Sequence, residues 1–369
     1  MKNVILLYFL LWSGFSYGLP QQWWNTPYPS QFDTQQLKPQ SPIVVNGNHF
    51  IDENQRIFTF KGVSIADPDK LQQQGKWNKA LFEEIKNWGA NTIRLPIHPG
   101  VWDMRGQEHY FTFIDQAVIW ANQLNLYLIL DWHSIGNLQS NLYQHPMYQT
   151  SWFQTQQFWQ QIAFRYQNVP TIAVYELFNE PTNDYIGHGT NSLGKLDWGQ
   201  WRTMMETLID IIRSYDNQVI PLVAGFNWAY DLSPVRHMPV ERENIAYAVH
   251  PYPQKAKPDD NKPQSFFMLW QQQWGFVASN APMIATEIGW SNESAPGAHI
   301  PTINNDGTYG PNIIDYLSRL GISWTAWVFD PEWAPQMIKN WDYEPTEQGR
   351  FFKQVLSGQY TPKTNNEDQ

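Results

Sequence analysis

Two glutamates stand at or near the ends of apolar segments rich in β-branched residues. Glu180 closes the segment Ile172–Glu180, and Glu287 lies near the end of Met283–Gly289. Two carboxylates that face each other can cleave a glycosidic bond, since one protonates the leaving oxygen while the other attacks the anomeric carbon or activates a water. A separation of ~5–5.5 Å would give double displacement with retention of configuration. The pair therefore favours glycoside chemistry.

Most of the other apolar segments also end in polar or ionisable residues. These residues are Arg94, Asp131, His133, Asn179, His250, Tyr252, Trp327 and Asp330. One charged residue at the end of a strand is ordinarily a solvated loop residue, but solvation does not explain the same feature on six segments. We therefore expect these side chains to converge on one site.

The two glutamates need different surroundings if they divide the work. The proton donor must keep its proton near neutral pH, helped by an apolar wall and a neighbouring negative charge. The attacking carboxylate must stay ionised, and a cation together with a hydroxyl would hold it so. Arg94 and Tyr252 are the residues that we expect to do this.

Eight apolar segments that alternate with amphipathic helical patterns predict an α/β fold. The predicted strands are Phe58–Ile65, Thr92–Ile97, Tyr127–His133, Ile172–Glu180, Val219–Asn227, Ile245–Tyr252, Met283–Gly289 and Ile322–Phe329. Predicted helices include Trp77–Trp88, Ser151–Gln167 and Asp197–Ser214, and a small N-terminal β-hairpin turns at Asn46-Gly47. Eight strand–helix alternations without a reversal predict a closed (β/α)8 TIM barrel, with its active site at the C-terminal ends of the strands.

Two acidic residues in these segments have simpler structural explanations. Glu176 lies four residues before Glu180 and deeper in its strand, so we expect it to be structural. Asp131 shares a strand face with His133, because side chains alternate with a period of two. We expect Asp131 to be a buried hydrogen-bond partner rather than a catalytic residue.

The histidines raise the question of a metal site. His98, beyond the second strand, is either a sugar contact or a loop residue without a role. A metal bound by His98, His133 and His250 is disfavoured, because the sequence lacks the paired-histidine spacing of metallohydrolases and Arg94 would add a cation to the site. We therefore expect no metal.

Asn179 and Glu180 pose a geometric problem. Neighbouring side chains on a strand face opposite sides, so both can reach one site only if the strand ends or bulges there. Pro181 follows directly and favours an ending. A strand running regularly through Glu180 would exclude a role for Asn179.

The segments that carry these residues resemble glycoside hydrolase family 5. They are Ile93-Arg94-Leu95-Pro96, Asp131-Trp132-His133, Tyr175-Glu176-Leu177-Phe178-Asn179-Glu180-Pro181, His250-Pro251-Tyr252, Thr286-Glu287-Ile288-Gly289 and Ser323-Trp324-Thr325-Ala326-Trp327. The resemblance covers nearly the whole predicted barrel and implies that Glu180 is the acid/base and Glu287 the nucleophile. It also implies a set of substrate-binding residues, with Asn179 on the 2-hydroxyl of the sugar and Trp327 as its stacking floor. The others, around the two carboxylates, are Arg94, His133, His250 and Tyr252.

The resemblance implies a retaining β-glycosidase without a cofactor, and we expect an endo-β-1,4-glucanase (cellulase) acting on plant or microbial β-glucan. A β-mannanase, a xyloglucanase and an exo-β-1,3-glucanase would use the same pair and stay open, because loops rather than the core decide among them. A catalytically inactive carbohydrate-binding barrel is disfavoured, because both carboxylates and their partners are present. The 20 tryptophans of the chain suit a sugar ligand. Trp228, Trp290 and Trp333 are candidates for further sugar subsites.

The first residues have the layout of a secretory signal peptide, with Lys2, an apolar run and small residues up to Gly18. We expect a signal peptide at 1–18, an arm at 19–41, the catalytic barrel at 42–358 and a polar tail at 359–369. The expected protein is secreted, extracellular or periplasmic.

The formal net charge of −10 disfavours a nucleic-acid partner, and no later segment predicts a membrane span. We expect a monomer whose partner is a β-linked polysaccharide or oligosaccharide.

Overall fold

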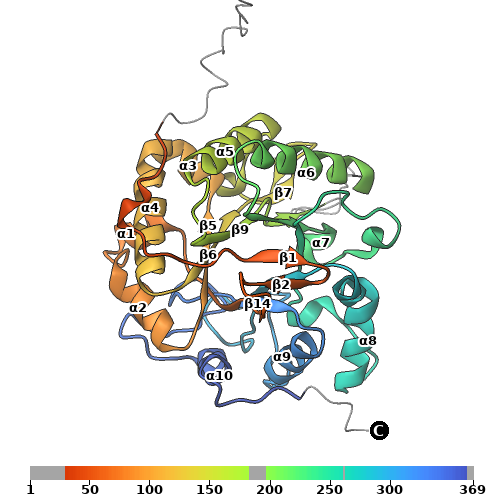
Figure 1. Cartoon of the computed structure of the whole chain (residues 1–369). Coiled ribbons are helices and arrows are strands. Elements are labelled where there is room, and N and C mark those ends of the chain that lie inside the picture. The colour runs from red at the N-terminus through yellow and green to blue at the C-terminus, as the bar shows by residue number, and fades with distance from the viewer. Residues whose placement is uncertain (1–29, 183–196, 261, 364–369) are drawn as a thin grey trace, which may run out of the picture.

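The computed structural model describes residues 30–182, 197–260 and 262–363 of the chain. Eight parallel strands close into a barrel in the order β11-β12-β13-β14-β4-β5-β6-β9. Their bounds are β4 (Lys61–Ser64), β5 (Thr92–Ile97), β6 (Tyr127–Trp132), β9 (Ile172–Glu176), β11 (Ile220–Ala224), β12 (Ala246–Ala248), β13 (Met283–Ile288) and β14 (Ser323–Ala326). Helices surround the strands (Figure 1). The predicted (β/α)8 barrel is confirmed.

The helices follow the predicted amphipathic patterns. They are α1 (Pro68–Gln73), α2 (Lys79–Asn87), α3 (Pro99–Arg105), α4 (Gln107–Gln123), α5 (Trp152–Arg165), α6 (Trp198–Arg213), α8 (Pro263–Gln273), α9 (Tyr309–Arg319) and α10 (Glu347–Leu356), with one irregular turn, α7 (Phe226–Ala229). The predicted helices begin slightly too early because the sequence pattern includes the capping residues. Ser151 closes a capping box with Gln154, and Asp197 accepts from the amide of Gly199.

A small antiparallel sheet closes one end of the barrel. It consists of β1 (Val44–Asn46), β2 (His49–Ile51) and β3 (Ile57–Phe58), and in Figure 1 the first two cross the middle of the barrel. The rings of Phe50 and Phe60 meet edge to face at 5.1 Å between centroids. The predicted hairpin is confirmed. The predicted first barrel strand was too long, because Phe58 pairs with Phe50 in the small sheet and the barrel strand begins only at Lys61.

The fourth barrel strand also ends earlier than predicted. β9 stops at Glu176, and the chain then changes its pairing partner: Glu180–Pro181 form β10, which pairs in parallel with β7 (Ile135–Asn137). β7 in turn pairs with β8 (Leu142–Tyr143). The amide of Glu180 donates to the Ser134 carbonyl at 3.0 Å. Because β9 ends early, the side chains of residues 177–180 need not alternate between the two faces of a strand. Asn179 and Glu180 can therefore point into the same site.

The described part of the N-terminal arm packs on the barrel. Phe32 is buried, and its amide donates to the Arg165 carbonyl at 2.9 Å. The amide of Lys38 donates to Asn122 Oδ1 at 2.8 Å. The expected signal peptide and the first part of the arm lie outside the described residues. None of the described helices is long and apolar enough to cross a membrane.

Candidate active site

A cleft of about 720 Å³ lies where the C-terminal ends of the barrel strands meet. Six residues singled out from the sequence line it: His133, Asn179, Glu180, Tyr252, Glu287 and Trp327. Arg94 and His250 are fully buried beneath it and reach its carboxylates from below. The structure therefore brings all eight predicted site residues together.

The two glutamates face each other across this cleft. One oxygen of Glu180, one of Glu287 and a ring nitrogen of His250 all lie within 4.8 Å of one another. Glu287 Oε1 accepts from Arg94 Nη1 at 2.9 Å, and its Oε2 accepts from the Tyr252 hydroxyl at 2.7 Å. Burial raises the pKa of Glu287, while His250, Arg94 and Tyr252 act in the opposite direction. The cation and the hydroxyl predicted beside the nucleophile are present.

Glu180 has a different partner. His250 Nδ1 lies 2.9 Å from Glu180 Oε1, and His250 Nε2 lies 2.9 Å from Thr286 Oγ1. Burial alone would lower the pKa of His250, but the carboxylates of Glu287, Glu176 and Glu180 outweigh it and raise the pKa to about 9. A protonatable imidazole thus lies directly beside the expected acid.

Arg94 organises the floor of the site. Its Nε donates to Glu176 at 2.6 Å, and its Nη2 lies 2.9 Å from Asp131 Oδ2. Asp131 Oδ2 also lies 2.6 Å from His133 Nδ1. Burial lowers the pKa of His133, and the nearby positive charges add to this, so its ring is neutral in the cleft. Glu176 and Asp131 have the buried hydrogen-bonding positions expected of them.

The side-chain amide of Asn179 has one nitrogen without a hydrogen-bond partner among the described residues. Its Oδ1 accepts from Arg94 Nη2 at 2.6 Å, which points Nδ2 away from the arginine. The residue is fully buried, and Nδ2 has no hydrogen-bond partner among the described residues. A buried donor without an acceptor costs free energy. Nδ2 is therefore suited to donate a hydrogen bond to a hydroxyl of a ligand.

Aromatic rings form one wall of the cleft. The Trp327 ring stacks on His133 at 5.3 Å between centroids with 1° between the planes, and on Trp333 at 6.1 Å. His98 meets His133 edge to face and is held by Asp67 Oδ2 at 2.9 Å from Nδ1. His98 therefore belongs to the cleft wall.

The three candidate subsite tryptophans have different surroundings. Trp228 and Trp333 line the cleft. Trp290 does not belong to its lining: it is buried and packs against Phe351 and Phe352, so our interpretation of it as a sugar platform was wrong. A strand-end position alone did not distinguish a cleft residue from one covered by helix α10.

Several residues that line the cleft were not predicted from the sequence. They include Gln144, Tyr148, Lys255, His299 and Glu332. Lys255 had a signal, because it follows Tyr252 by three residues in the same segment. Burial lowers the pKa of Lys255 to about 8, against the opposing effect of Glu180 and Glu287.

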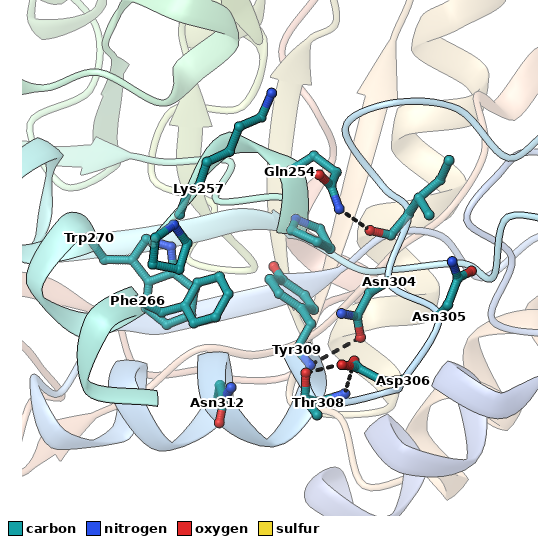
Figure 2. Close-up of a pocket in the computed structure, with 14 residues that line it drawn as sticks. Gln254, Lys257, Phe266, Trp270, Asn304, Asn305, Asp306, Thr308, Tyr309 and Asn312 are labelled. Carbon is teal, nitrogen blue, oxygen red and sulfur yellow. Dashed lines mark hydrogen bonds between the residues drawn. The ribbon is translucent and has the colours of Figure 1, made fainter. Parts of the chain in front are cut away.

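A second cavity, of about 410 Å³, lies on the other side of the wall that carries Lys255. Figure 2 shows Phe266 and Trp270 on one side of it and Asn304, Asn305 and Tyr309 on the other. Asp306 is its one carboxylate, and that group accepts from the amide and hydroxyl of Thr308. This cavity has no pair of carboxylates and cannot support the same chemistry.

A metal ion would have one cluster of possible ligands among the described residues, namely Glu180, His250 and Glu287. His250 already shares a hydrogen bond with Glu180, while Arg94 and Tyr252 occupy the two oxygens of Glu287. The guanidinium beside Glu287 also repels a cation. The donor set is thus better suited to acid–base chemistry than to holding a metal.

Comparison with known proteins supplies the family. A model described as cellulase (glycosyl hydrolase family 5) matches residues 51–332. The chain belongs to glycosyl hydrolase family 5. This confirms the resemblance inferred from the motifs, and it makes the chain a glycoside hydrolase.

Solved and curated relatives of this family-5 hydrolase carry glucanase names. A β-glucanase from Saccharophagus degradans is 57% identical, with 92% of this chain and 99% of that chain covered and a TM-score of 0.87. Another structure of that enzyme is a complex with cellotetraose. An endoglucanase from Paenibacillus polymyxa is 24% identical over 84% of this chain and 87% of its own length. Endoglucanase A from Butyrivibrio fibrisolvens is 27% identical over 61% of this chain, which spans only 49% of that relative.

Proposed function

We propose that this hydrolase is an endo-β-1,4-glucanase that works by double displacement, with Glu180 as acid/base and Glu287 as nucleophile. The observation that carries the proposal is the approach of one oxygen of each carboxylate to within 4.8 Å in the cleft. Retaining glycosidases hold their carboxyl groups ~5–5.5 Å apart, whereas inverting enzymes leave ~6.5–9.5 Å for a water. The short separation supports retention.

In the first displacement, a Glu287 oxygen attacks the anomeric carbon, and the bond from that carbon to the leaving oxygen breaks. Glu180 transfers a proton to the leaving oxygen. The His250 imidazolium, which is protonated at neutral pH, passes its Nδ1 proton to Glu180 along their hydrogen bond. Arg94 and Tyr252 orient the Glu287 carboxylate for the attack by holding one oxygen each.

In the second displacement, Glu180 is a carboxylate and takes a proton from water. The water oxygen attacks the anomeric carbon of the glycosyl–enzyme ester, and the Glu287 carboxylate leaves. One water is consumed for each bond cleaved, and the product has the β-configuration of the substrate. Glu180 then returns a proton to His250 Nδ1, which restores the starting state.

The cleft surfaces support a glucan as the substrate. Trp327 and Trp333 present stacked rings for the apolar faces of pyranoses, and Asn179 Nδ2, which has no partner among the described residues, can donate to a hydroxyl. The S. degradans β-glucanase, crystallised with cellotetraose, supports a chain of β-1,4-linked glucose units. The relatives named endoglucanases support internal cleavage.

We also propose that the enzyme is exported by the signal peptide at 1–18 and that 42–358 form its single catalytic domain. Lys2 and the small residues ending at Gly18 support export. A monomer suffices for the reaction, because both glutamates and the partners described above come from one chain.

Proton NMR during hydrolysis of cellopentaose tests the stereochemistry. We expect the β-anomer of the new reducing end to appear first and the α-anomer only after mutarotation. Release of the α-anomer first would overturn double displacement.

Release of reducing ends from carboxymethylcellulose, mixed-linked glucan, xyloglucan, mannan and laminarin tests the substrate. The highest rates are expected on the first two, with and without EDTA. A preference for mannan or laminarin would contradict the proposal, and inactivation by EDTA would favour a metal-dependent hydrolase.

A further inference from the structure

The chain after β11 adopts a backbone conformation that proteins seldom use without support. Asn227, Trp228 and Ala229 have φ angles of 55°, 55° and 54°. Left-handed backbone is unfavourable for residues with a Cβ and normally occurs at single positions. Three such residues in a row persist only if their surroundings hold them.

All three carbonyls of this turn contact the segment that follows β12. Lys255 Nζ donates to the Asn227 carbonyl at 2.5 Å and lies 3.4 Å from the Trp228 carbonyl. The amide of His250 donates to the Ala229 carbonyl at 2.7 Å. The Lys255 ammonium also lies 5.2 Å from the centre of the Trp228 ring. One half-buried cation therefore binds both the backbone and the side chain of the turn.

The loop that carries Lys255 is itself fixed by hydrogen bonds. The amide of Gln254 donates to the Pro301 carbonyl at 2.9 Å, and that of Lys255 donates to the Tyr252 carbonyl at 3.0 Å. Gln254 Nε2 donates to the Ile303 carbonyl at 2.8 Å, as Figure 2 shows from the side of the second cavity. The ammonium thus acts from a fixed position.

The barrel order places this turn opposite the Trp327 wall. Trp228 and Lys255 follow β11 and β12, whereas Trp327 and His133 follow β14 and β6. Glu180 and Glu287, which belong to the segment after β9 and to β13, separate the two groups around the barrel. A glucan that passes between the glutamates therefore has one part near Trp327 and the other near Trp228.

We propose that Lys255 is a positioning residue that fixes the left-handed turn and so presents Trp228 to the leaving-group part of the glucan. This inference rests on the proposed function, because the ligand of Trp228 is taken to be a β-glucan. Trp228 lines the cleft, and its Nε1 donates to Gln144 Oε1 at 3.2 Å, which is a further contact that positions the ring. Lys255 sets the affinity for long chains, and the two glutamates perform the chemistry.

Lys255→Met tests this role, because methionine keeps the length of the side chain and removes the ammonium. On cellopentaose we expect KM to rise about tenfold, the effect of losing one well-placed aromatic platform, with kcat changed less than about threefold. On β-cellobiosyl fluoride, whose leaving group is a single atom, KM should stay the same. Lys255→Arg should restore most of the affinity, and Lys257→Met, an exposed lysine on the second cavity, is the matched control.

A double variant and hydrogen exchange complete the test. Trp228→Ala should raise KM for cellopentaose as Lys255→Met does, and the double variant should raise it no further, because both act through one platform. Additive effects, or an equal loss on the fluoride, would overturn the inference. Amide exchange at residues 227–230 should be faster in Lys255→Met than in Lys257→Met, and equal rates would also overturn it. If the wild-type protein cleaves no β-glucan, the proposed function fails, whereas the exchange measurement still decides whether Lys255 holds the turn.

Discussion

Thr286 Oγ1 lies 2.9 Å from His250 Nε2, and this contact fixes the ring with Nδ1 toward Glu180. The Thr286 hydroxyl has one proton, and it donates that proton to Glu176 Oε1 at 2.7 Å. His250 Nε2 must therefore be the donor toward Thr286. His250 Nδ1, which faces Glu180, is left to share the proton that the reaction needs.

Thr286→Val should lower kcat on cellopentaose about tenfold. The substitution keeps the shape of the side chain but removes a hydrogen bond within a charged, buried network, which is worth ~1.5–3 kcal/mol. Without it, the His250 ring is no longer fixed in the form that passes a proton to Glu180. Thr286→Ser keeps the hydroxyl and should stay close to the wild-type rate. Equal rates in the valine and serine variants would show that the hydroxyl does not act on His250.

The residues that end strands could be predicted from the sequence, whereas contacts that form only on folding could not. The eight apolar segments predict the barrel because parallel strands are buried on both faces. Glu180, Glu287, Arg94 and Tyr252 could be predicted because their segments converge at one barrel face. The contact between Thr286 and Glu176 joins residues 110 positions apart and requires the closed barrel.

Two local departures from regular structure could not be predicted. The end of β9 at Glu176 depends on the pairing of Glu180 with Ile135 in β7, a partner that the alternating pattern does not reveal. The role of Lys255 depends on the Asn227 carbonyl, a backbone group 28 residues earlier in the chain. In both cases the partner is a backbone group, and its identity does not depend on residue type.

The pH dependence of stability should report the charge of His250. Its folded-state pKa of about 9 lies above the ordinary value of 6.5, so its contribution to the free energy of unfolding is complete below pH 6.5 and is lost as the pH rises through 9. At ~1.4 kcal/mol per pH unit, the contribution amounts to about 3 kcal/mol. Urea unfolding of the wild type and of His250→Gln at several pH values measures it. The difference between the two proteins should shrink toward alkaline pH, and a difference that stays constant or grows would contradict the assignment.

Asn179 should account for the enzyme's use of the sugar 2-hydroxyl. Its buried Nδ2 has no partner among the described residues, and hydrogen bonds to the 2-hydroxyl supply several kcal/mol in glycosidase transition states. We expect Asn179→Ala to lower kcat/KM on an aryl β-cellobioside about 100-fold. The wild type should lose a similar factor when the reacting sugar is 2-deoxy, and the variant should lose little. An undiminished 2-deoxy penalty in Asn179→Ala would place the hydroxyl elsewhere.

The two glutamates should give opposite stereochemistry when azide replaces the missing carboxylate. In Glu180→Ala, a dinitrophenyl β-cellobioside still forms the glycosyl–enzyme ester, because its leaving group needs no proton. Azide then displaces Glu287 and gives the β-glycosyl azide. In Glu287→Ala, azide attacks the substrate directly and gives the α-glycosyl azide, with an activated leaving group such as fluoride.

The anomeric configuration of the two azide products, measured by NMR, shows which glutamate is the acid/base and which is the nucleophile. Both variants should keep the melting temperature of the wild type within a few degrees, because Glu180 and Glu287 lie at the cleft surface of a barrel whose core they do not fill. Full activity of Glu287→Ala without azide would refute its role as nucleophile. The opposite result would be the α-azide from Glu180→Ala and the β-azide from Glu287→Ala. It would mean that Glu287 is the acid/base and Glu180 the nucleophile. His250, which lies 2.9 Å from Glu180, would then assist the attacking carboxylate.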